Sequence, residues 1–284
     1  CSQANPGSND LVLKVKKSLC GDRRAANLWC RKLRDALTSP AFGFTCSEID
    51  PCLFTRGDCI MVLHVDDAVL FGKDEAAVQA VLSKLKERGC DFSRDGSFSS
   101  HLGIEIIRRS DGTIKLTQKG LKKSCIDLMG LSDASTTPAP IAEPLHKHAE
   151  SEPFDETFNY RSALGMLQCV GNNTHPECAC AINARARCAL DPRQARGQAL
   201  KRIGRYLKGA LGGGLIIDSK GPVSLDCCVD ADFAGNCNQK DADDPRSACS
   251  RTGCVLTLGS APVSWKSKMQ SCIALSTMEA KHIA

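Results

Sequence analysis

The stretch IMVLHVDDAVLFG, from Ile60 to Gly72, constrains the fold most strongly, because two β-rich apolar runs flank a pair of adjacent aspartates. Two such runs with a short polar break predict an antiparallel hairpin whose tip carries Asp66 and Asp67. Aspartate is a common turn residue, so the pair has a purely structural interpretation. Two carboxylates held this close repel each other and are stable as anions mainly with a cation between them, so the same tip is also a candidate Mg²⁺ site.

Sequence patterns on both sides of this hairpin predict an α/β fold of the α+β type. Apolar residues recur at helical spacing in several stretches, and Asp111 with Gly112 between two β-rich runs signals a second hairpin. Four prolines without apolar periodicity mark 132–153 as a linker. The other expected elements are a helix ending before Pro40, a helix capped by Asp74, three helices between Tyr160 and Leu211, strands after Gly212, and a final helix from Ser276.

The 18 cysteines of this 284-residue chain raise the question of disulfides or zinc. No pair shows the C-x-x-C spacing of metal knuckles, and the chain is longer than small disulfide-stapled domains, so we expect reduced thiols at apolar positions. The sequence shows no secretory signal and no apolar run that could span a bilayer. We therefore expect an intracellular protein, cytoplasmic or nuclear, without a membrane partner. A start without Met and an end within a helical pattern indicate a piece of a longer protein.

Charged residues are segregated along the chain, although the net charge is only +5. Basic residues dominate between 185 and 208, and aspartates dominate between 226 and 244. This suits a protein that binds phosphates with one surface and cations with another, but charge alone favours the interpretation of two solvated surfaces of opposite sign. The basic residues are Arg185, Arg187, Arg193, Arg196, Lys201, Arg202, Arg205 and Lys208.

Six blocks follow one another along the chain in an order that indicates a family. HVDDAVLFG is similar to the polymerase motif of reverse transcriptases, an aromatic residue followed by x-Asp-Asp, and KSLCGDRRAANLW is similar to a SLYGLKQ block that precedes it. DPCLF and HLGIEI with TIKLTQ match the blocks on either side of the hairpin. NNTHPE and RYLKG lie in a stretch similar to the connecting region, and VDADFAG with ALSTMEAKHIA is similar to the start of ribonuclease H. Nearly the whole chain thus resembles the copia-type (LTR) retrotransposon polyprotein.

The resemblance implies a fold in three segments. These are a partial reverse-transcriptase palm over 1–115, a helical thumb and connection over 116–212, and the start of a ribonuclease H-like α/β domain over 213–284. It also implies an RNA-directed DNA polymerase joined to ribonuclease H, acting by two-metal phosphoryl transfer with Mg²⁺. The implied partners are an RNA template, a DNA primer, their RNA–DNA hybrid, deoxynucleoside triphosphates and the rest of the polyprotein.

The resemblance assigns roles to individual residues. Asp66 and Asp67 are the implied polymerase metal ligands, and Asp230 is the implied first ribonuclease H carboxylate, whereas Asp232 is expected to be structural. The basic helix is expected to lie along the template-primer backbone, with an ordinary amphipathic surface helix as the alternative. Its expected contact residues are Arg196, Lys201, Arg202, Arg205 and Lys208.

Two departures from the family pattern predict that this chain alone is incomplete and inactive. A third polymerase carboxylate is expected on a strand upstream of the SLYGLKQ-like block, outside this sequence. The family ending Glu-Ala-Glu-Tyr reads Glu279, Ala280, Lys281 and His282 here, so an ammonium that repels Mg²⁺ stands at the second ribonuclease H ligand position. Glu279 cannot replace the missing ligand, because two residues along a helix rotate a side chain by about 200°.

Two rival hypotheses follow from the same residues. One is a non-catalytic nucleic-acid binder that keeps the basic helix over 193–208. The other is a redox or metal-binding protein built on the cysteines. Cys20, Cys178, Cys180 and Cys254 fall where the family tends to carry larger side chains, which favours drift in a retired element over redox chemistry.

Overall fold

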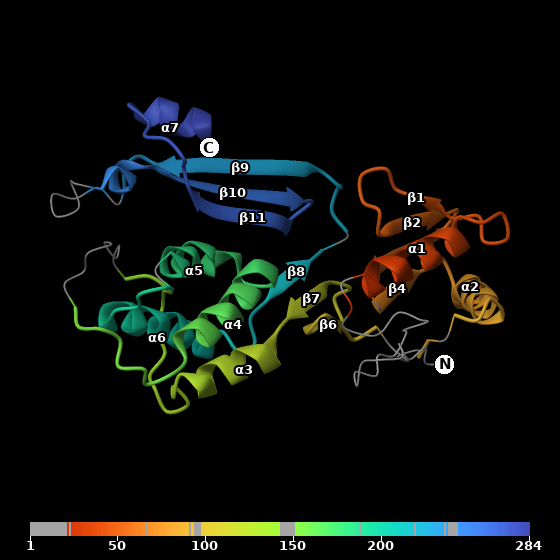
Figure 1. Ribbon diagram of the computed structural model, residues 1–284, viewed down its shortest axis with the longest axis horizontal. Helices are drawn as coiled ribbons and strands as arrows, with labels where there is room; N and C mark the ends of the chain where they lie inside the picture. Colours follow the sequence, from red (N-terminus) through yellow and green to blue (C-terminus); the bar gives the residue numbers. More distant parts are fainter. Residues whose placement is uncertain are drawn as a thin grey trace, which may run out of the picture. The chain divides into compact units, whose positions relative to one another are not determined.

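The computed structural model divides into two compact units, Cys1–Asp95 and Gly96–Ala284, whose elements are labelled in Figure 1. Both units combine helices with antiparallel sheets, so the predicted α+β class is confirmed. The structure describes residues 22, 24–65, 67–90, 92–93, 98–142, 151–187, 189–218, 220–235, 237 and 244–284.

The first unit is a four-stranded antiparallel sheet in the order β1-β2-β3-β4 with two helices on one face. Side chains alternate along β3, where Cys59, Met61 and Leu63 are buried and Ile60 and His64 are exposed, because successive residues of a strand point to opposite faces. One hydrophobic cluster joins the buried set to both helices. The elements are α1 (Ala25–Leu37), β1 (Thr45–Cys46), β2 (Leu53–Arg56), β3 (Cys59–His64), β4 (Asp67–Phe71) and α2 (Glu75–Glu87).

Local signals determine where α2 begins and ends. The Asp74 carboxylate accepts a hydrogen bond from the Ala77 amide at 2.8 Å, which confirms the predicted cap. Val81 and Leu85 from the predicted apolar stripe are buried. Gly89 follows the helix with a φ of 71°, a left-handed conformation that favours glycine after a helix C-terminus.

The second unit begins with a sheet in the order β5-β6-β7-β8. Asp111 and Gly112, with a φ of 85° at the glycine, form the turn between β6 and β7, so the second predicted hairpin is confirmed. β8 was expected with the later strands but pairs with β7, with Leu215 opposite Leu116. Any side chain at Gly214 would collide with the Leu116 carbonyl, so glycine permits this approach. The strands are β5 (Ser100–His101), β6 (Ile104–Arg108), β7 (Ile114–Thr117) and β8 (Leu215–Ile217).

Four helices form the core of the second unit. The predicted stripe Leu200, Ile203 and Leu207 of α6 is fully buried in a cluster that also takes side chains from α3, α4 and α5. The described part of the predicted linker packs on α6, where the Thr137 hydroxyl donates to the Arg202 carbonyl at 3.3 Å. The elements are α3 (Lys119–Leu128), α4 (Tyr160–Asn173), the 3₁₀ turn η1 (Pro176–Cys178), α5 (Ala179–Ala186) and α6 (Gln194–Gly209).

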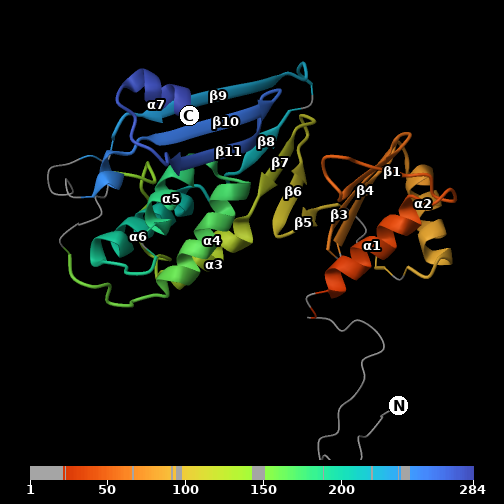
Figure 2. The ribbon, with the colours of Figure 1, turned by 45° about the horizontal axis from the view of Figure 1, so that its top comes forward.

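A three-stranded antiparallel sheet, in the order β11-β10-β9, completes the second unit. Figures 1 and 2 show it lying over α5, and the Trp265 indole of β11 donates to the Gly171 carbonyl of α4 at 2.7 Å. A final helix begins after Ser276, whose hydroxyl accepts from the Glu279 amide at 3.1 Å, as predicted. The elements are β9 (Leu225–Asp232), η3 (Pro245–Ala248), β10 (Arg251–Leu258), β11 (Ala261–Met269) and α7 (Thr277–Ile283).

Within the described residues, no helix has the length and apolar character needed to cross a membrane. The proposed segment boundaries at 115 and 212 stay predictions.

Candidate functional site

The hairpin of β3 and β4 places Asp67, one of the two predicted polymerase aspartates, beside its turn. The strands pair antiparallel down to His64 opposite Asp67, which leaves a two-residue turn. Val65 in this turn has a φ of 53°, an unusual conformation for a β-branched residue. Backbone strain of this kind persists where the surrounding structure fixes it and is concentrated at functional sites. Asp66 lies outside the described residues.

Asp67 is the one predicted polymerase ligand whose surroundings the structure describes. It is the first residue of β4 and is exposed, and its carboxylate makes no hydrogen bond or ion pair with any described residue. A solvent-facing carboxylate on a rigid hairpin fits the oxygen chemistry of Mg²⁺. No group of three His, Cys, Asp or Glu side chains suited to a metal occurs among the residues that the structure describes. The role of Asp67 as a metal ligand stays a prediction.

Asp230, the predicted ribonuclease H carboxylate, is paired with Lys281, the residue at the predicted position of the second ligand. It lies on β9 opposite Gly253 of β10, and its Oδ1 is 3.3 Å from the Lys281 ammonium of α7. The hydrogen bond of the Ala231 amide and then the Lys281 ammonium hold the pKa of the Asp230 carboxyl below its usual range. Both side chains are exposed, so the pair contributes little to stability.

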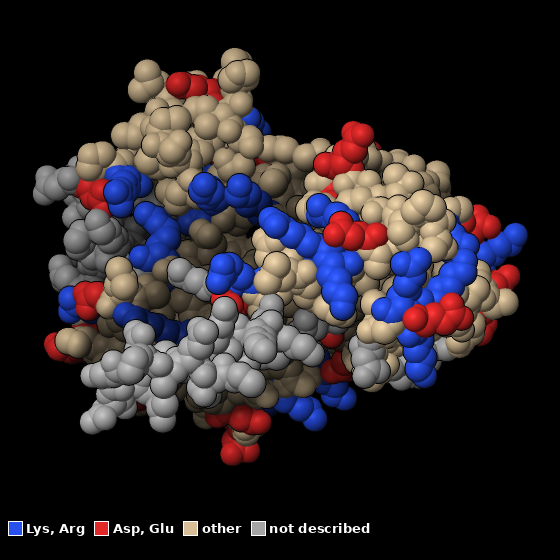
Figure 3. Space-filling view, turned by 45° about the vertical axis from the view of Figure 1, so that its right-hand side comes forward, with Lys and Arg blue, Asp and Glu red and all other residues tan. Residues whose placement is uncertain are grey.

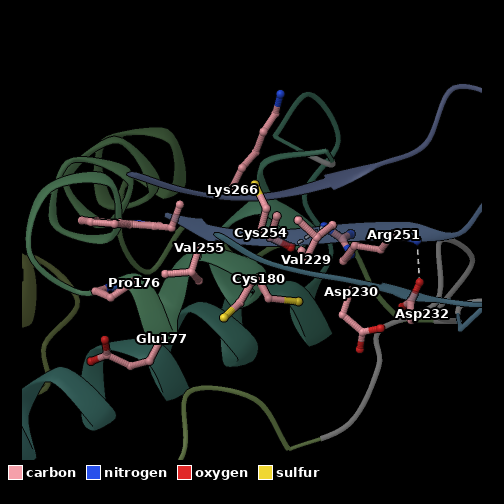
Figure 4. A pocket seen from close by; sticks show the side chains of 15 residues that line it. Pro176, Glu177, Cys180, Val229, Asp230, Asp232, Arg251, Cys254, Val255 and Lys266 are labelled. Atoms are coloured by element: carbon pink, nitrogen blue, oxygen red, sulfur yellow. Dashed lines mark hydrogen bonds between the residues drawn. The ribbon is translucent and has the colours of Figure 1, made fainter. Parts of the chain in front are cut away.

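The surroundings of Asp230 do not fit a divalent cation. Figure 4 shows Asp230 and Asp232 on β9 near Arg251, in a pocket of about 480 Å³. The Asp232 carboxylate accepts a hydrogen bond from the Arg251 backbone amide, and its expected structural role stays a prediction. Lys281 already supplies the positive charge beside Asp230, and a second cation there would be repelled. The predicted conflict between Lys281 and Mg²⁺ thus has a structural basis.

The predicted contact residues of the basic helix have different environments. Arg196 is only 5% exposed and lies in the interior of the second unit. The Lys208 ammonium donates to the backbone carbonyls of Ser132 and Ala134. Lys201 lies over the Phe158 ring, 5.5 Å from its centroid. These three side chains therefore have structural contacts.

Arg202 and Arg205 are the other two predicted contacts, and both are half-buried on α6. Neither forms an ion pair with an acid among the described residues, although the Nε atom of each is buried. Figure 3 shows Lys and Arg side chains in several groups with acidic side chains beside them, so the drawn face carries no single continuous basic patch.

A buried polar network in the second unit was not predicted from the sequence. Lys122 of α3 is fully buried, and its ammonium donates to the carbonyls of Ala210 and Gly213 at 2.9 and 3.0 Å. It also lies 3.1 Å from Nε2 of His175. Because an ammonium has only donors, His175 accepts at Nε2 and carries its proton on Nδ1. Burial, and then the charge of Lys115, lower the pKa of Lys122 to about 8.

The network continues to a pocket of about 450 Å³. His175 Nδ1 is 2.7 Å from the Glu177 carboxylate, which also accepts from the Tyr206 hydroxyl at 3.1 Å. Burial raises the pKa of Glu177, but the hydrogen bond with His175 is among the effects that bring it below its usual value. A sequence signal for the network exists, because Lys122 shares the buried stripe of α3 with Ile126.

The cysteines that the structure describes are all unpaired thiols. Cys125 and Cys178 belong to the hydrophobic core of the second unit, and burial raises the pKa of each to about 12. Their thiols thus stay protonated and apolar, as expected for cysteine used to fill space.

The comparison with family models decides the ancestry. Residues 2–143, half of the chain, match the family described as reverse transcriptase (RNA-dependent DNA polymerase). The chain belongs to this reverse transcriptase family. The hairpin tip and both flanking blocks fall within the matched residues, so the predicted family is confirmed.

Full-length relatives place this reverse transcriptase region within retrotransposon polyproteins. The chain is 30% identical over 98% of its length to a retrovirus-related Pol polyprotein from transposon TNT 1-94 of Nicotiana tabacum, and 32% identical over 95% to that from transposon RE1 of Arabidopsis thaliana. It spans 21% and 18% of these polyproteins. An uncharacterized mitochondrial protein of Arabidopsis thaliana is 26% identical over 79% of the chain and 89% of its own length. No solved structure matches the chain.

Proposed function

We propose that the chain is the part of a retrotransposon polyprotein that presents the catalytic aspartate hairpin of RNA-directed DNA polymerisation. The observation that supports this most directly is the β3–β4 hairpin, which exposes Asp67 at its tip directly after the turn at Val65. Asp66 and Asp67 would hold Mg²⁺, which supplies alignment of the primer 3′-hydroxyl with the incoming phosphate and stabilisation of developing charge. The substrates would be a primed RNA template and deoxynucleoside triphosphates in the cytoplasm or nucleus.

The ribonuclease H part is proposed as a remnant. Strands β9 to β11 and α7 carry Asp230 at the position of the first carboxylate, but Lys281 pairs with it. Cleavage of the RNA strand by two-metal chemistry needs carboxylates on both sides of the metal ions. We therefore expect no ribonuclease activity from this chain.

The polymerase proposal is tested on the purified 284-residue chain with a primed RNA template, deoxynucleotides and Mg²⁺. We expect no incorporation, because one hairpin supplies only part of the ligand set. Asp66→Asn and Asp67→Asn provide matched controls at the hairpin tip. Incorporation by the unaltered chain that either substitution abolishes would show a complete polymerase site and contradict the proposal that the segment alone is inactive.

A second candidate function is nucleic-acid binding without catalysis. It is supported by Arg202 and Arg205 on α6, which form no ion pair with a described acid. Guanidinium groups in such positions suit contacts to the phosphate backbone. This function requires neither metal site, so it survives the loss of the ribonuclease H ligand.

A further inference from the structure

A histidine stands at the aromatic position of the polymerase-like motif, directly before the turn of the β3–β4 hairpin. His64 is the last residue of β3 and is exposed. Its imidazole makes no hydrogen bond or ion pair with any described residue. Unlike a phenyl or phenol ring, an imidazole carries nitrogen atoms that are common metal ligands. His64 is therefore a potential ligand without a structural partner.

The register of the hairpin places His64 beside Asp67. The two residues are opposite each other in the last pair of the β3–β4 ladder. Directly opposite residues of an antiparallel pair project their side chains from the same face, with Cβ atoms roughly 4.5–5.5 Å apart. Imidazole nitrogen and carboxylate oxygen both coordinate a divalent ion such as Zn²⁺ at about 2.0–2.2 Å. One ion can therefore contact both side chains.

The face that carries this pair is directed away from the helices of the first unit. Met61 and Leu63 of β3 are buried in the hydrophobic cluster that includes side chains of α1 and α2. His64 points to the other face, because successive residues of a strand alternate. The Asp67 carboxylate is also exposed and has no described partner. Within the first unit, an ion can thus approach both groups from the side opposite the two helices.

A nitrogen ligand changes which ions the hairpin tip prefers. Mg²⁺ is a hard ion that takes oxygen ligands, whereas imidazole is a good ligand for divalent transition metals. Softer ions such as Cu⁺ and Zn²⁺ would also bind the many free thiols of this chain. Mn²⁺ and Fe²⁺ lie between these extremes, so a pair of one nitrogen and one carboxylate suits them better than it suits Mg²⁺.

We propose that His64 and Asp67 bind one divalent transition-metal ion at the hairpin tip, and that the His64 nitrogen makes this site prefer Mn²⁺ and Fe²⁺ to Mg²⁺. The inference rests on the proposed function in one respect, because Asp67 is assigned there to the metal. The described residues supply no group of three ligands, so the other coordination positions are left to water or substrate oxygens. Binding by two side chains is therefore weak and reversible.

The direct test measures Mn²⁺ binding to the full chain by electron paramagnetic resonance, followed by displacement with Mg²⁺, without template, primer or nucleotide. The ratio of Mn²⁺ affinity to Mg²⁺ affinity should fall at least fivefold in His64→Phe, which keeps a flat ring but removes the nitrogen ligands. Asp67→Asn should weaken the binding of both ions. His282→Phe is the matched control, because it removes an exposed histidine of α7, and it should leave the ratio unchanged.

Electron spin echo spectroscopy of the bound Mn²⁺ identifies the ligand atoms. The unaltered chain and His282→Phe should show coupling of Mn²⁺ to an imidazole nitrogen, and His64→Phe should not. A merely structural role of His64 would change the affinity for both ions alike and would give no such coupling.

Three results would overturn the proposal: no Mn²⁺ binding, bound Mn²⁺ without nitrogen coupling, or equal affinity ratios in the unaltered chain and His64→Phe. Bound Mn²⁺ that lacks nitrogen coupling and is lost in Asp67→Asn would leave the proposed function standing, because Asp67 would still hold the metal. Incorporation of nucleotides by the unaltered chain would contradict only the proposed inactivity of the segment.

Discussion

At the scale of single residues, Lys281 decides whether the C-terminal sheet can hold a metal. Its ammonium lies 3.3 Å from Asp230 and takes the place of a cation. Lys281→Glu should therefore create a divalent-ion site, since it replaces a positive group by a carboxylate next to Asp230. We expect Mn²⁺ binding, measured by electron paramagnetic resonance, to become at least tenfold tighter than in the unaltered chain.

Two further variants show whether that gain depends on the Asp230 site. Lys268→Glu makes the same change in charge at an exposed position of β11 and should leave Mn²⁺ binding unchanged. Asp230→Asn combined with Lys281→Glu should remove the gain. Binding of Mn²⁺ by the unaltered chain that Asp230→Asn abolishes would show that Lys281 does not exclude the metal.

At the scale of elements, the Lys122 side chain links α3 to the C-terminal end of α6. Its burial should make the free energy of unfolding depend on pH. Its pKa of about 8 in the folded protein lies below the value of 10.5 expected when it is exposed. The unfolded chain thus binds more protons between these values, so folding becomes more favourable as pH rises. From pH 7 to 9.5 we expect a gain of about 2 kcal/mol from this group alone.

The measurement is chemical unfolding of wild type, Lys122→Met and Lys123→Met across this pH range. Lys123 is the matched control because it is the next residue and is exposed. The free energy of unfolding of wild type and Lys123→Met should rise relative to that of Lys122→Met. Comparison between variants is needed because the buried thiols of Cys125 and Cys178, with pKa values near 12, oppose the effect above about pH 9. Parallel pH curves for all three proteins would contradict this role of Lys122.

Elements were predictable where local chemistry determines them. The Asp74 cap, the turn at Gly112 and the buried stripe containing Ile203 follow from neighbouring residues, so sequence patterns identify them. The pairing of β8 with β7 joins segments about 100 residues apart and depends on the space that Gly214 leaves, which no local pattern encodes. The same distinction applies to the site residues. The burial of a charged residue such as Arg196 depends on the packing of several helices, so it could not be predicted from neighbouring residues.

At the scale of the whole molecule, the net charge of +5 and the basic tract between 185 and 208 favour binding to nucleic acid. Contacts to phosphates release counterions, so affinity falls with salt in proportion to the number of phosphates neutralised. Arg202 and Arg205 of α6 form no ion pair with a described acid, whereas Lys208 is bound to backbone carbonyls. We therefore expect the full chain to bind an RNA–DNA hybrid through a small number of phosphate contacts.

The test is fluorescence anisotropy with a labelled RNA–DNA hybrid at a series of salt concentrations. Arg202→Gln and Arg205→Gln should each weaken binding and reduce the slope of log affinity against log salt by roughly 1, the value for one lost phosphate contact. Lys208→Gln is the matched control on the same helix and should leave the slope unchanged, because its ammonium is already engaged within the protein. If the affinity of the unaltered chain stays constant between low and moderate salt, the contact with the hybrid is not electrostatic. If Lys208→Gln weakens binding as much as the two arginine substitutions do, the internal hydrogen bonds of Lys208 do not keep it from the phosphates.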